Sequence, residues 1–302
     1  MVYDCFIFFN ELDLLEIRLN ILSPVVDKFV LVEADRTFSN EKKFFFFEEN
    51  KERYKPFLEK IIYIKITDYV LEYKSAWDME FYQRNKIHEG IKHCQENDVI
   101  IISDIDEIPN PDEIVKYKNR EYDSGLFCLR LVFFYYFLNY QKIIKKYFYM
   151  TKIITFSTYM NGKWTPQKIR DGKNDGMIKK GGWHFSYLGG FEMIKYKIKS
   201  FAHQEYNNNN FVNDKIFDKI KNGYDLFDRK DYRFVPVKIR KGKFPEYIIN
   251  NQEKYKHLIF QKINYLHNFL VYVTVGCYFI LRPLYPILKP IIKRLSGNVH
   301  SL

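Results

Sequence analysis

The chain has 302 residues, of which 47% are hydrophobic and 19% aromatic, so it is long and apolar enough for a large folded core. Its net charge of +11 suits a phosphate-bearing substrate, a nucleic acid or an anionic membrane surface. No recognised nucleic-acid motif occurs, and the Lys and Arg residues are spread along the chain. The cysteines, Cys5, Cys94, Cys128 and Cys277, lack metal-ligand spacing and predict buried free thiols in a reducing compartment.

The first part of the chain predicts a βαβ unit. Residues 2–9 favour a strand, 11–22 a helix and 29–32 a second, buried strand. Strand, helix and strand at this spacing indicate a parallel sheet, whose ligands bind beyond the carboxyl ends of the strands. The polar residues at those ends are therefore binding candidates, or alternatively helix caps and loop residues. They are Asn10, Glu11, Glu33 and Asp35.

The next segment continues the alternation of elements. We predict a helix over 50–58, a strand over 61–66 and a helix over 75–94, while the four Phe at 44–47 pack on the core or on a partner. Arg84 lies in the last of these helices. An arginine there could bind a pyrophosphate through two hydrogen bonds, and the alternative is a solvated surface arginine.

Residues 99–102 predict a strand buried on both faces, and three carboxylates follow it directly. If the chain stays extended, Asp104 and Asp106 point to the same side and repel each other. A divalent cation with oxygen ligands would relieve that repulsion. The alternative is a turn in which the Asp side chains accept from backbone donors. Glu107 is expected to be structural.

The second half of the chain predicts shorter elements around a loop. Residues 161–182 are rich in Gly, Lys, Asn and Asp, and predict a flexible loop that orders over a substrate. The other elements are helices over 112–117, 191–203 and 212–220, and strands over 125–138, 153–156 and 234–237.

His184 lies in a short aromatic strand between two glycine pairs, at 181–182 and 189–190. The glycines would allow the backbone to approach a ligand closely, which favours a functional histidine. A structural histidine packed among aromatic rings is the alternative.

The C-terminal region differs in composition. We assign residues 1–245 to a catalytic domain and 246–302 to a helical, apolar and basic tail. The apolar run 269–281 is too short to span a bilayer, and the prolines and basic residues after it predict that 268–295 lies in a membrane interface. A core helix or an oligomer contact are the alternatives. The N-terminus lacks signal-peptide features, so we expect a cytoplasmic protein, peripheral on the membrane.

These features together predict one chemistry. A divalent metal held by Asp104, Asp106 and His184 would clamp the pyrophosphate of a nucleotide-sugar and neutralise the leaving diphosphate. An acceptor hydroxyl then needs a carboxylate base on the opposite face of the sugar if configuration inverts.

The sequence resembles glycosyltransferase family 17. The likeness includes Ser-Asp-Ile-Asp-Glu-Ile-Pro at 103–109 and Gly-Trp-His-Phe-Ser-Tyr-Leu-Gly-Gly at 182–190. Further matching blocks lie, in order, at 3–6, 9–19, 25–30, 32–34, 37–39, 83–85 and 200–207. Together they cover roughly residues 1–240 and are specific jointly rather than singly. An animal member of the family has an N-terminal membrane anchor, which we do not expect in this chain.

The resemblance implies an α/β fold of the GT-A type: a Rossmann-like, nucleotide-sugar-binding mixed sheet flanked by helices. It also implies an inverting mechanism, a Mn²⁺ or Mg²⁺ ion and a UDP-sugar donor, UDP-N-acetylglucosamine in the animal member. Asp104 and Asp106 match the family's metal and nucleotide-sugar motif, and His184 matches its Trp-His-Phe-Ser block. The expected nucleotide-sugar site contains Phe9, Asn10, Glu11, Glu33, Arg84 and Asp104.

Two carboxylates are candidates for the catalytic base. Asp171 lies before the His184 strand and Glu205 follows the next helix, and we favour Asp171. The acceptor would be a glycan or a lipid-linked glycan. Two other readings remain open: a basic module that binds nucleic acid or anionic glycan without catalysis, and a nucleotidyltransferase or phosphatase that uses the same carboxylates.

Overall fold

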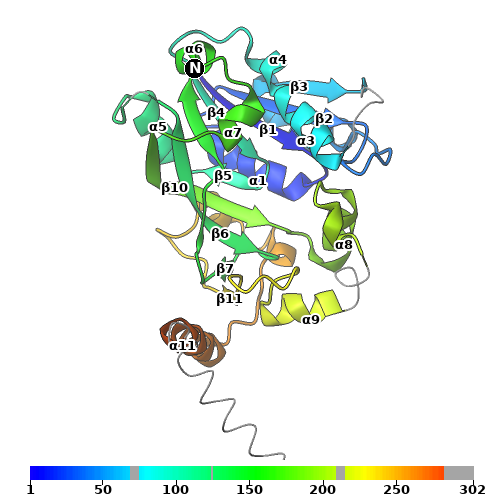
Figure 1. Ribbon diagram of the computed structural model, residues 1–302, viewed down its shortest axis with the longest axis vertical. Coiled ribbons are helices and arrows are strands. Elements are labelled where there is room, and N and C mark those ends of the chain that lie inside the picture. The colour runs from blue at the N-terminus through cyan, green and yellow to red at the C-terminus, as the bar shows by residue number, and fades with distance from the viewer. Residues whose placement is uncertain (69–74, 124, 209–214, 282–302) are drawn as a thin grey trace, which may run out of the picture. The chain divides into compact units, whose positions relative to one another are not determined.

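The computed structural model describes residues 1–68, 75–123, 125–208 and 215–281 (Figure 1). It divides into two compact units, Met1–Gln261 and Lys262–Leu302. The assignment of the catalytic domain to 1–245 concerns function rather than compactness, and it stays a prediction.

Four parallel strands form the first half of the central sheet. They are β1 (Val2–Phe8), β2 (Lys28–Ala34), β3 (Ile61–Ile66) and β4 (Val99–Asp104), in the order β3-β2-β1-β4. Helix α1 (Leu12–Leu22) connects β1 to β2, so the predicted βαβ unit is confirmed. Because β1 and β4 are parallel neighbours, the residues that follow both strands meet at one edge of the sheet.

The second half of the sheet is mixed. Antiparallel pairs join β4 to β9 (Lys152–Thr155) and β9 to β6 (Phe127–Tyr135), and β10 (Gly176–Ser186) runs parallel to β6. The short strand β5 (Glu107–Pro109) pairs with β10. Shorter strands on β6 and beyond it are β7 (Tyr140–Lys142), β8 (Tyr147–Phe148) and β11 (Phe234–Pro236). The predicted mixed α/β sheet flanked by helices is confirmed.

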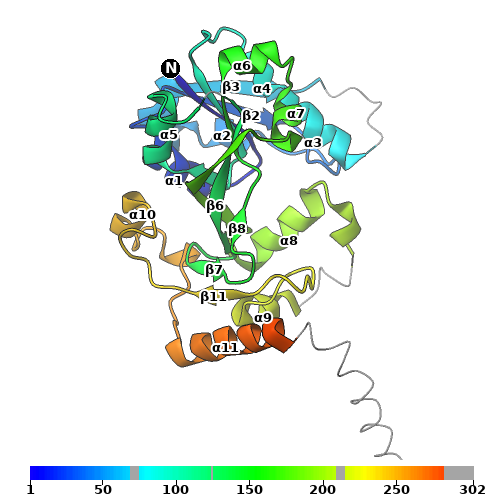
Figure 2. The same cartoon turned by 60° about the vertical axis from the view of Figure 1, so that its left-hand side comes forward.

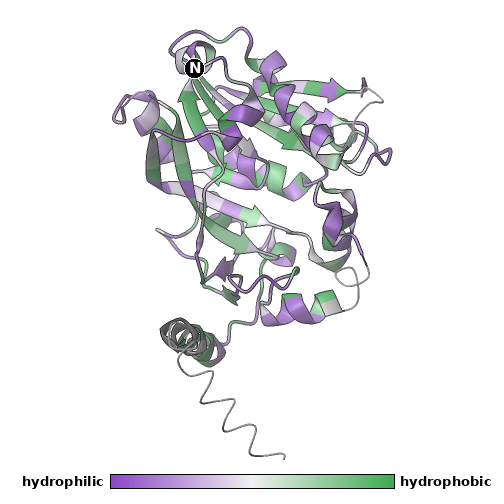
Figure 3. Cartoon of the chain, viewed as in Figure 1, coloured by the Kyte–Doolittle hydropathy of each residue, from purple (hydrophilic) through white to green (hydrophobic). Residues whose placement is uncertain are grey.

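Both faces of β1, β2 and β4 are buried, as their continuous apolar sequences require, whereas the edge strand β3 exposes Lys65. In β1, Phe6 and Phe8 pack in one core with α1, whereas Cys5 and Ile7 pack in a second core on the other face. Hydrophobic colour is accordingly concentrated in the strands (Figure 3). The alternation follows from the two-residue period of a strand.

The second core lies beneath a layer of four helices, which gather on one side of the sheet in Figure 2. They are α3 (Ala76–Asn85), α4 (Ile87–Ile91), α6 (Phe156–Asn161) and α7 (Pro166–Asp171). The first core is covered by α1 together with α2 (Phe46–Glu49), the 3₁₀ segments η1 (Lys51–Lys60) and η3 (Lys256–Leu258), α5 (Pro111–Lys118) and α10 (Glu246–Asn250). The remaining elements of this unit are α8 (Gly190–Ser200), η2 (Gln204–Tyr206) and α9 (Lys215–Asn222).

Some predicted elements differ from the structure. Residues 161–182 are not a loop but contain α7 and the start of β10. The Thr165 hydroxyl accepts a hydrogen bond from the Lys168 amide, and Pro166 stands in the first turn, which together start a helix that composition alone did not reveal. The predicted helix over 75–94 is two helices, α3 and α4, with Lys86 between them.

The second unit contains helix α11 (Tyr265–Leu281). Among the described residues, no helix is long and apolar enough to cross a membrane. Of the predicted interface segment, residues 282–295 lie outside the described part of the chain. Cys5, Cys94 and Cys128 are buried free thiols, as predicted.

Candidate functional site

A cavity of about 460 Å³ opens at the carboxyl ends of β1 and β4. Seven of the residues predicted for the site line it: Phe9, Glu11, Arg84, Asp104, Asp106, Asp171 and His184. They come from β1, α3, β4, α7 and β10, and the first segments following those strands. Asn10, Glu33 and Glu205 are not among the lining residues.

The acidic segment at the end of β4 is held from below by Arg18 of α1, which is fully buried. Its guanidinium forms an ion pair with Asp4 at 2.6 Å and donates to the Ser103 hydroxyl, also at 2.6 Å. The same group donates to the backbone carbonyls of residues 104, 105 and 107, at 2.9, 3.1 and 2.8 Å. A single buried cation thus fixes the backbone that carries the three carboxylates.

Two arginines hold the Asp104 carboxylate. Arg84 donates to Oδ1 at 2.9 Å and Arg170 donates to Oδ2 at 2.5 Å. Removal from water acts to raise the pKa of Asp104, but Arg170 and Arg84 outweigh it and lower that pKa below its ordinary value. Because its pKa is lowered, Asp104 stays ionised at neutral pH. Its side chain is 30% exposed and lines the cavity.

The Glu107 carboxylate is buried and bonded inside the protein. It accepts from Arg170 at 2.6 and 2.9 Å, from the Thr151 hydroxyl at 2.6 Å and from the Asp104 amide at 3.3 Å. Oε2 accepts three of these bonds and Oε1 accepts one, so a lone pair remains on Oε1. This burial and bonding fit the structural role predicted for Glu107.

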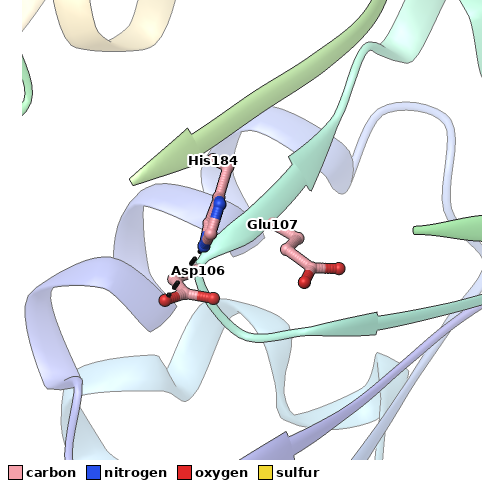
Figure 4. A group of neighbouring side chains, drawn as sticks. All are labelled: Asp106, Glu107 and His184. Carbon is pink, nitrogen blue, oxygen red and sulfur yellow. Dashed lines mark ion pairs between the residues drawn. The ribbon is translucent and has the colours of Figure 1, made fainter. Parts of the chain in front are cut away.

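Asp106 and His184 both line the cavity, and their side chains point toward each other (Figure 4). The His184 Nε2 atom lies 3.4 Å from Asp106 Oδ2, and the Lys197 ammonium of α8 lies 3.5 Å from the same oxygen. Burial acts to raise the pKa of Asp106, but His184 and Lys197 outweigh it and hold the pKa well below its usual range. Both contacts are longer than ordinary hydrogen bonds, so this carboxylate is held more loosely than Asp104 or Glu107.

The donor atoms fit a divalent cation at Asp106 and His184. Ligand atoms of Asp106, Glu107 and His184 lie within 4.8 Å of one another, and carboxylate oxygen with imidazole nitrogen suits Mn²⁺. The Nε2 atom of His184 is the nitrogen that faces Asp106, whereas its buried Nδ1 atom has no hydrogen-bond partner in the described part of the chain. The Glu107 and Asp104 carboxylates are already bound to arginines, so they fit the role of direct ligand poorly.

The residues predicted at the strand ends divide into two groups. Phe9 stacks on Tyr196 with ring centroids 5.2 Å apart, and Glu11 accepts from the amides of residues 9 and 10 while pairing with Lys197. Glu33 is instead fully buried, and accepts from Lys43 at 3.0 Å and from Tyr63 at 2.9 Å. Glu33 therefore does not line the cavity, but it binds Lys43, whose side chain does.

The two candidate bases differ in placement. Asp171 ends α7, is exposed, and lines the cavity, where its Oδ2 atom accepts from Gln167 at 2.7 Å. The amide oxygen of Gln167 accepts from Arg84, so a chain of hydrogen bonds links Asp171 to Asp104. Glu205 lies in η2 and pairs with His203, and its side chain is 58% exposed.

The glycine pair before His184 serves the sheet rather than a ligand, contrary to the prediction. A Cβ atom on Gly182 would lie 2.2 Å from the Ile108 carbonyl oxygen, and one on Gly181 would lie 2.6 Å from the Arg130 amide nitrogen. Only glycine fits β10 this closely between β5 and β6. The second pair, Gly189 and Gly190, has positive φ at the start of α8.

Sequence reasoning missed three cations that organise the site: Arg18, Arg170 and Lys197. Arg18 lies on the apolar side of α1, where an arginine is buried and needs a carboxylate partner. Its place in the apolar pattern could therefore have identified it from the sequence. Arg170 and Lys197 lie in segments with many other basic residues, where nothing in the sequence separates them from solvated neighbours.

Comparisons with known proteins support one assignment. Two solved structures share low similarity with this chain. The first is 4-diphosphocytidyl-2C-methyl-D-erythritolsynthase from Anaerococcus prevotii DSM 20548, which is 12% identical with a TM-score of 0.32, and the match covers 59% of this chain and 86% of that one. The second is S. aureus TarS 1–349, which is 10% identical with a TM-score of 0.37, and the match covers 74% of this chain and 70% of that one. Scores this low carry no conclusion about this chain. No curated protein matches the sequence. The model of glycosyltransferase family 17 matches residues 1–263, which is most of the chain. The chain therefore belongs to glycosyltransferase family 17, and its class of activity is glycosyl transfer.

Proposed function

We propose that this glycosyltransferase is cation-dependent and inverting, and that it moves N-acetylglucosamine from UDP-N-acetylglucosamine to a hydroxyl of a glycan or lipid-linked glycan. The observation that carries the proposal is the loosely held Asp106 carboxylate facing His184 in a cavity at the carboxyl ends of β1 and β4. Parallel α/β sheets bind nucleotide ligands at that edge.

Asp106 and His184 would hold a Mn²⁺ or Mg²⁺ ion. When bound, the cation supplies positive charge that neutralises the diphosphate leaving group. Asp104 has a different task, because its arginine contacts leave lone pairs on each oxygen free for a donor hydroxyl. The fixed geometry of this carboxylate favours recognition of the ribose or sugar hydroxyls of the donor.

Asp171 is the proposed base. It would accept the proton of the acceptor hydroxyl as that oxygen bonds to the anomeric carbon and the bond from that carbon to the diphosphate oxygen breaks. The exposed position of Asp171 at the cavity supports this role. Glu205 has weaker support because it is paired with His203 and does not line the cavity.

A panel of nucleotide-sugars with and without Mn²⁺ tests the proposal. We expect one UDP-sugar to raise the melting temperature selectively in the presence of Mn²⁺, and to be consumed with release of UDP. Asp106→Asn should abolish Mn²⁺-dependent turnover while the melting temperature stays within a few degrees. Asp112→Asn is a matched control, because that carboxylate lies at the start of α5 outside the cavity lining.

Turnover that survives in Asp106→Asn would refute the metal role of Asp106. Asp171→Asn should lower turnover by about two to four orders of magnitude with little change in donor affinity, the range typical of a lost general base. Consumption of a nucleoside triphosphate instead of a UDP-sugar would replace the proposal with nucleotidyl transfer.

The proposal extends to the C-terminal segment 268–295, which we place in an anionic membrane interface on the cytoplasmic side. Support comes from α11, where Phe269 and Leu270 are 62% and 54% exposed, and from the basic residues after position 281. The full chain should co-sediment with vesicles containing phosphatidylserine and not with neutral ones. A Phe269→Glu, Leu270→Glu variant that still co-sediments equally well would refute this contact.

A further inference from the structure

Five cationic side chains line the cavity, and their existing bonds distinguish them. Arg84 and Arg170 are committed to Asp104 and Glu107 by bonds of 2.5 to 2.9 Å. Lys43 is held by the buried Glu33 at 3.0 Å. Arg36 donates to Asn40 within its own turn. The fifth cation, Lys197, faces the carboxylate that is held most loosely.

Lys197 projects from the last turns of α8 to a point between two carboxylates. Its ammonium lies 3.1 Å from Glu11 Oε1 and 3.5 Å from Asp106 Oδ2, and its side chain is 24% exposed. Glu11 is itself fixed, because its Oε2 atom accepts from the backbone amides of residues 9 and 10. The carboxylate of Glu11 therefore holds the ammonium at the cavity wall, while the longer contact to Asp106 leaves room for another anion.

An ammonium group has three N–H donors and no acceptor. At this position one donor suffices for Glu11, and the others remain for anionic oxygens in the cavity. A diphosphate that approaches Asp106 would be repelled by that carboxylate unless a cation lies between or beside them. Beside the cation proposed at Asp106 and His184, Lys197 offers such a charge on a side chain, since its ammonium lies 3.5 Å from Asp106 Oδ2.

We propose that Lys197 binds the diphosphate of the nucleotide donor, with Glu11 as the residue that positions its ammonium. This inference rests on the proposed function, since it deepens the same site. As the bond from the anomeric carbon to the diphosphate oxygen breaks, its electron pair stays on that oxygen, and the ammonium stabilises the charge that develops there. Lys197 thus acts beside a bound divalent cation rather than in its place.

Calorimetric titration with UDP, with other nucleoside diphosphates and with uridine tests the inference without any turnover. The full-length chain is used as wild type, Lys197→Met, Lys197→Arg and Lys199→Met, each with and without Mn²⁺. Lys199 is the matched control, because it lies on the same helix, is exposed and does not line the cavity. Melting temperatures verify that each variant is folded.

Lys197→Met should weaken UDP binding about 10- to 100-fold with and without Mn²⁺, the range expected for a charge-assisted contact to phosphate. Uridine, which has no phosphate, should bind wild type and Lys197→Met equally. Lys197→Arg should keep most of the UDP affinity, and Lys199→Met should match wild type. Mn²⁺ binding, followed by electron paramagnetic resonance, should persist in Lys197→Met.

The possible failures point to different errors. Unchanged UDP affinity in Lys197→Met, or an equal loss of uridine affinity, overturns the role of Lys197 and leaves the donor proposal intact. If wild type binds another nucleoside diphosphate in a Lys197-dependent way, the UDP assignment fails and the role of Lys197 stands. If wild type binds no nucleoside diphosphate at all, both are overturned.

Discussion

Replacing Arg18 with methionine removes the one cation that holds the acidic segment from beneath the sheet. Methionine has similar length and no charge, so the change tests the polar contacts rather than the volume. Five groups lose their donor: the Asp4 carboxylate, the Ser103 hydroxyl and the carbonyls of residues 104, 105 and 107. The Arg18 and Asp4 side chains have no exposed surface, so water cannot replace the lost contact between them.

The magnitude follows from leaving a buried carboxylate without its partner. Breaking a fully buried ion pair by removing one member costs about 3–5 kcal/mol, because the remaining charge is uncompensated. Removing both charges is less costly, since no charge is left without a partner. We therefore expect Arg18→Met to cost about 3–5 kcal/mol, and the double variant with Asp4→Asn to cost at least about 2 kcal/mol less than the sum of the single changes.

Urea unfolding followed by circular dichroism measures these changes, and the midpoint shift at constant slope gives the free-energy difference. Initial rates with the UDP-sugar that the nucleotide-sugar panel selects give the second readout, since displacement of the segment carrying Asp104 and Asp106 should lower turnover in any folded variant. A cost below about 1 kcal/mol for Arg18→Met, or additive effects in the double variant, would refute the role given to Arg18.

Two further predictions concern β10 and the carboxylates. Gly182→Ala should destabilise the protein by about 3 kcal/mol or more, because φ is +137° and the new Cβ would lie 2.2 Å from the Ile108 carbonyl oxygen. Gly190→Ala should cost about 1–2 kcal/mol, because φ at Gly190 is also positive but no atom lies within 4 Å of the new Cβ. Equal urea unfolding midpoints for the two variants would contradict this reasoning. Stability should fall as pH drops below about 5, because the pKa of Asp104 and Asp106 is lowered in the folded state and the unfolded chain takes up their protons first. Melting temperatures between pH 3 and 6 check this, and an Asp106→Asn variant with the same slope as wild type would refute the contribution of Asp106.

The sequence predicts the parallel half of the sheet well because continuous apolar runs have few alternatives. Val99–Asp104 and Ile61–Ile66 were expected at nearly the observed bounds, and their residues are buried or half-buried except for the exposed Lys65. The mixed half was harder to predict. Strand β10 pairs with β5 on one side and β6 on the other, a placement determined by contacts between distant segments rather than by local pattern.

The same limit explains what sequence reasoning missed at the site. Asp104, Asp106 and His184 could be identified as candidates because carboxylates after a buried strand, and a histidine among glycines and aromatics, are unusual. Arg170 could not be identified, since its role depends on α7 packing against β4. A basic residue in a chain with 48 Lys and Arg gains its function from the carboxylate it meets, and only the folded structure identifies that carboxylate.

The three neighbouring carboxylates show how the surroundings divide their tasks. Glu107 is buried and accepts four hydrogen bonds, one of them from the Asp104 amide, so it holds the backbone in place. Asp104 is held by two arginines but remains 30% exposed, so it offers a rigid acceptor to a ligand. Asp106 has only the longer contacts to His184 and Lys197, and it can therefore exchange partners at lower cost. The arginines bound directly to Asp104 and Glu107 would repel an arriving cation at short range, whereas the positive groups beside Asp106 lie farther from its oxygens, so Asp106 fits the proposed role of metal ligand best.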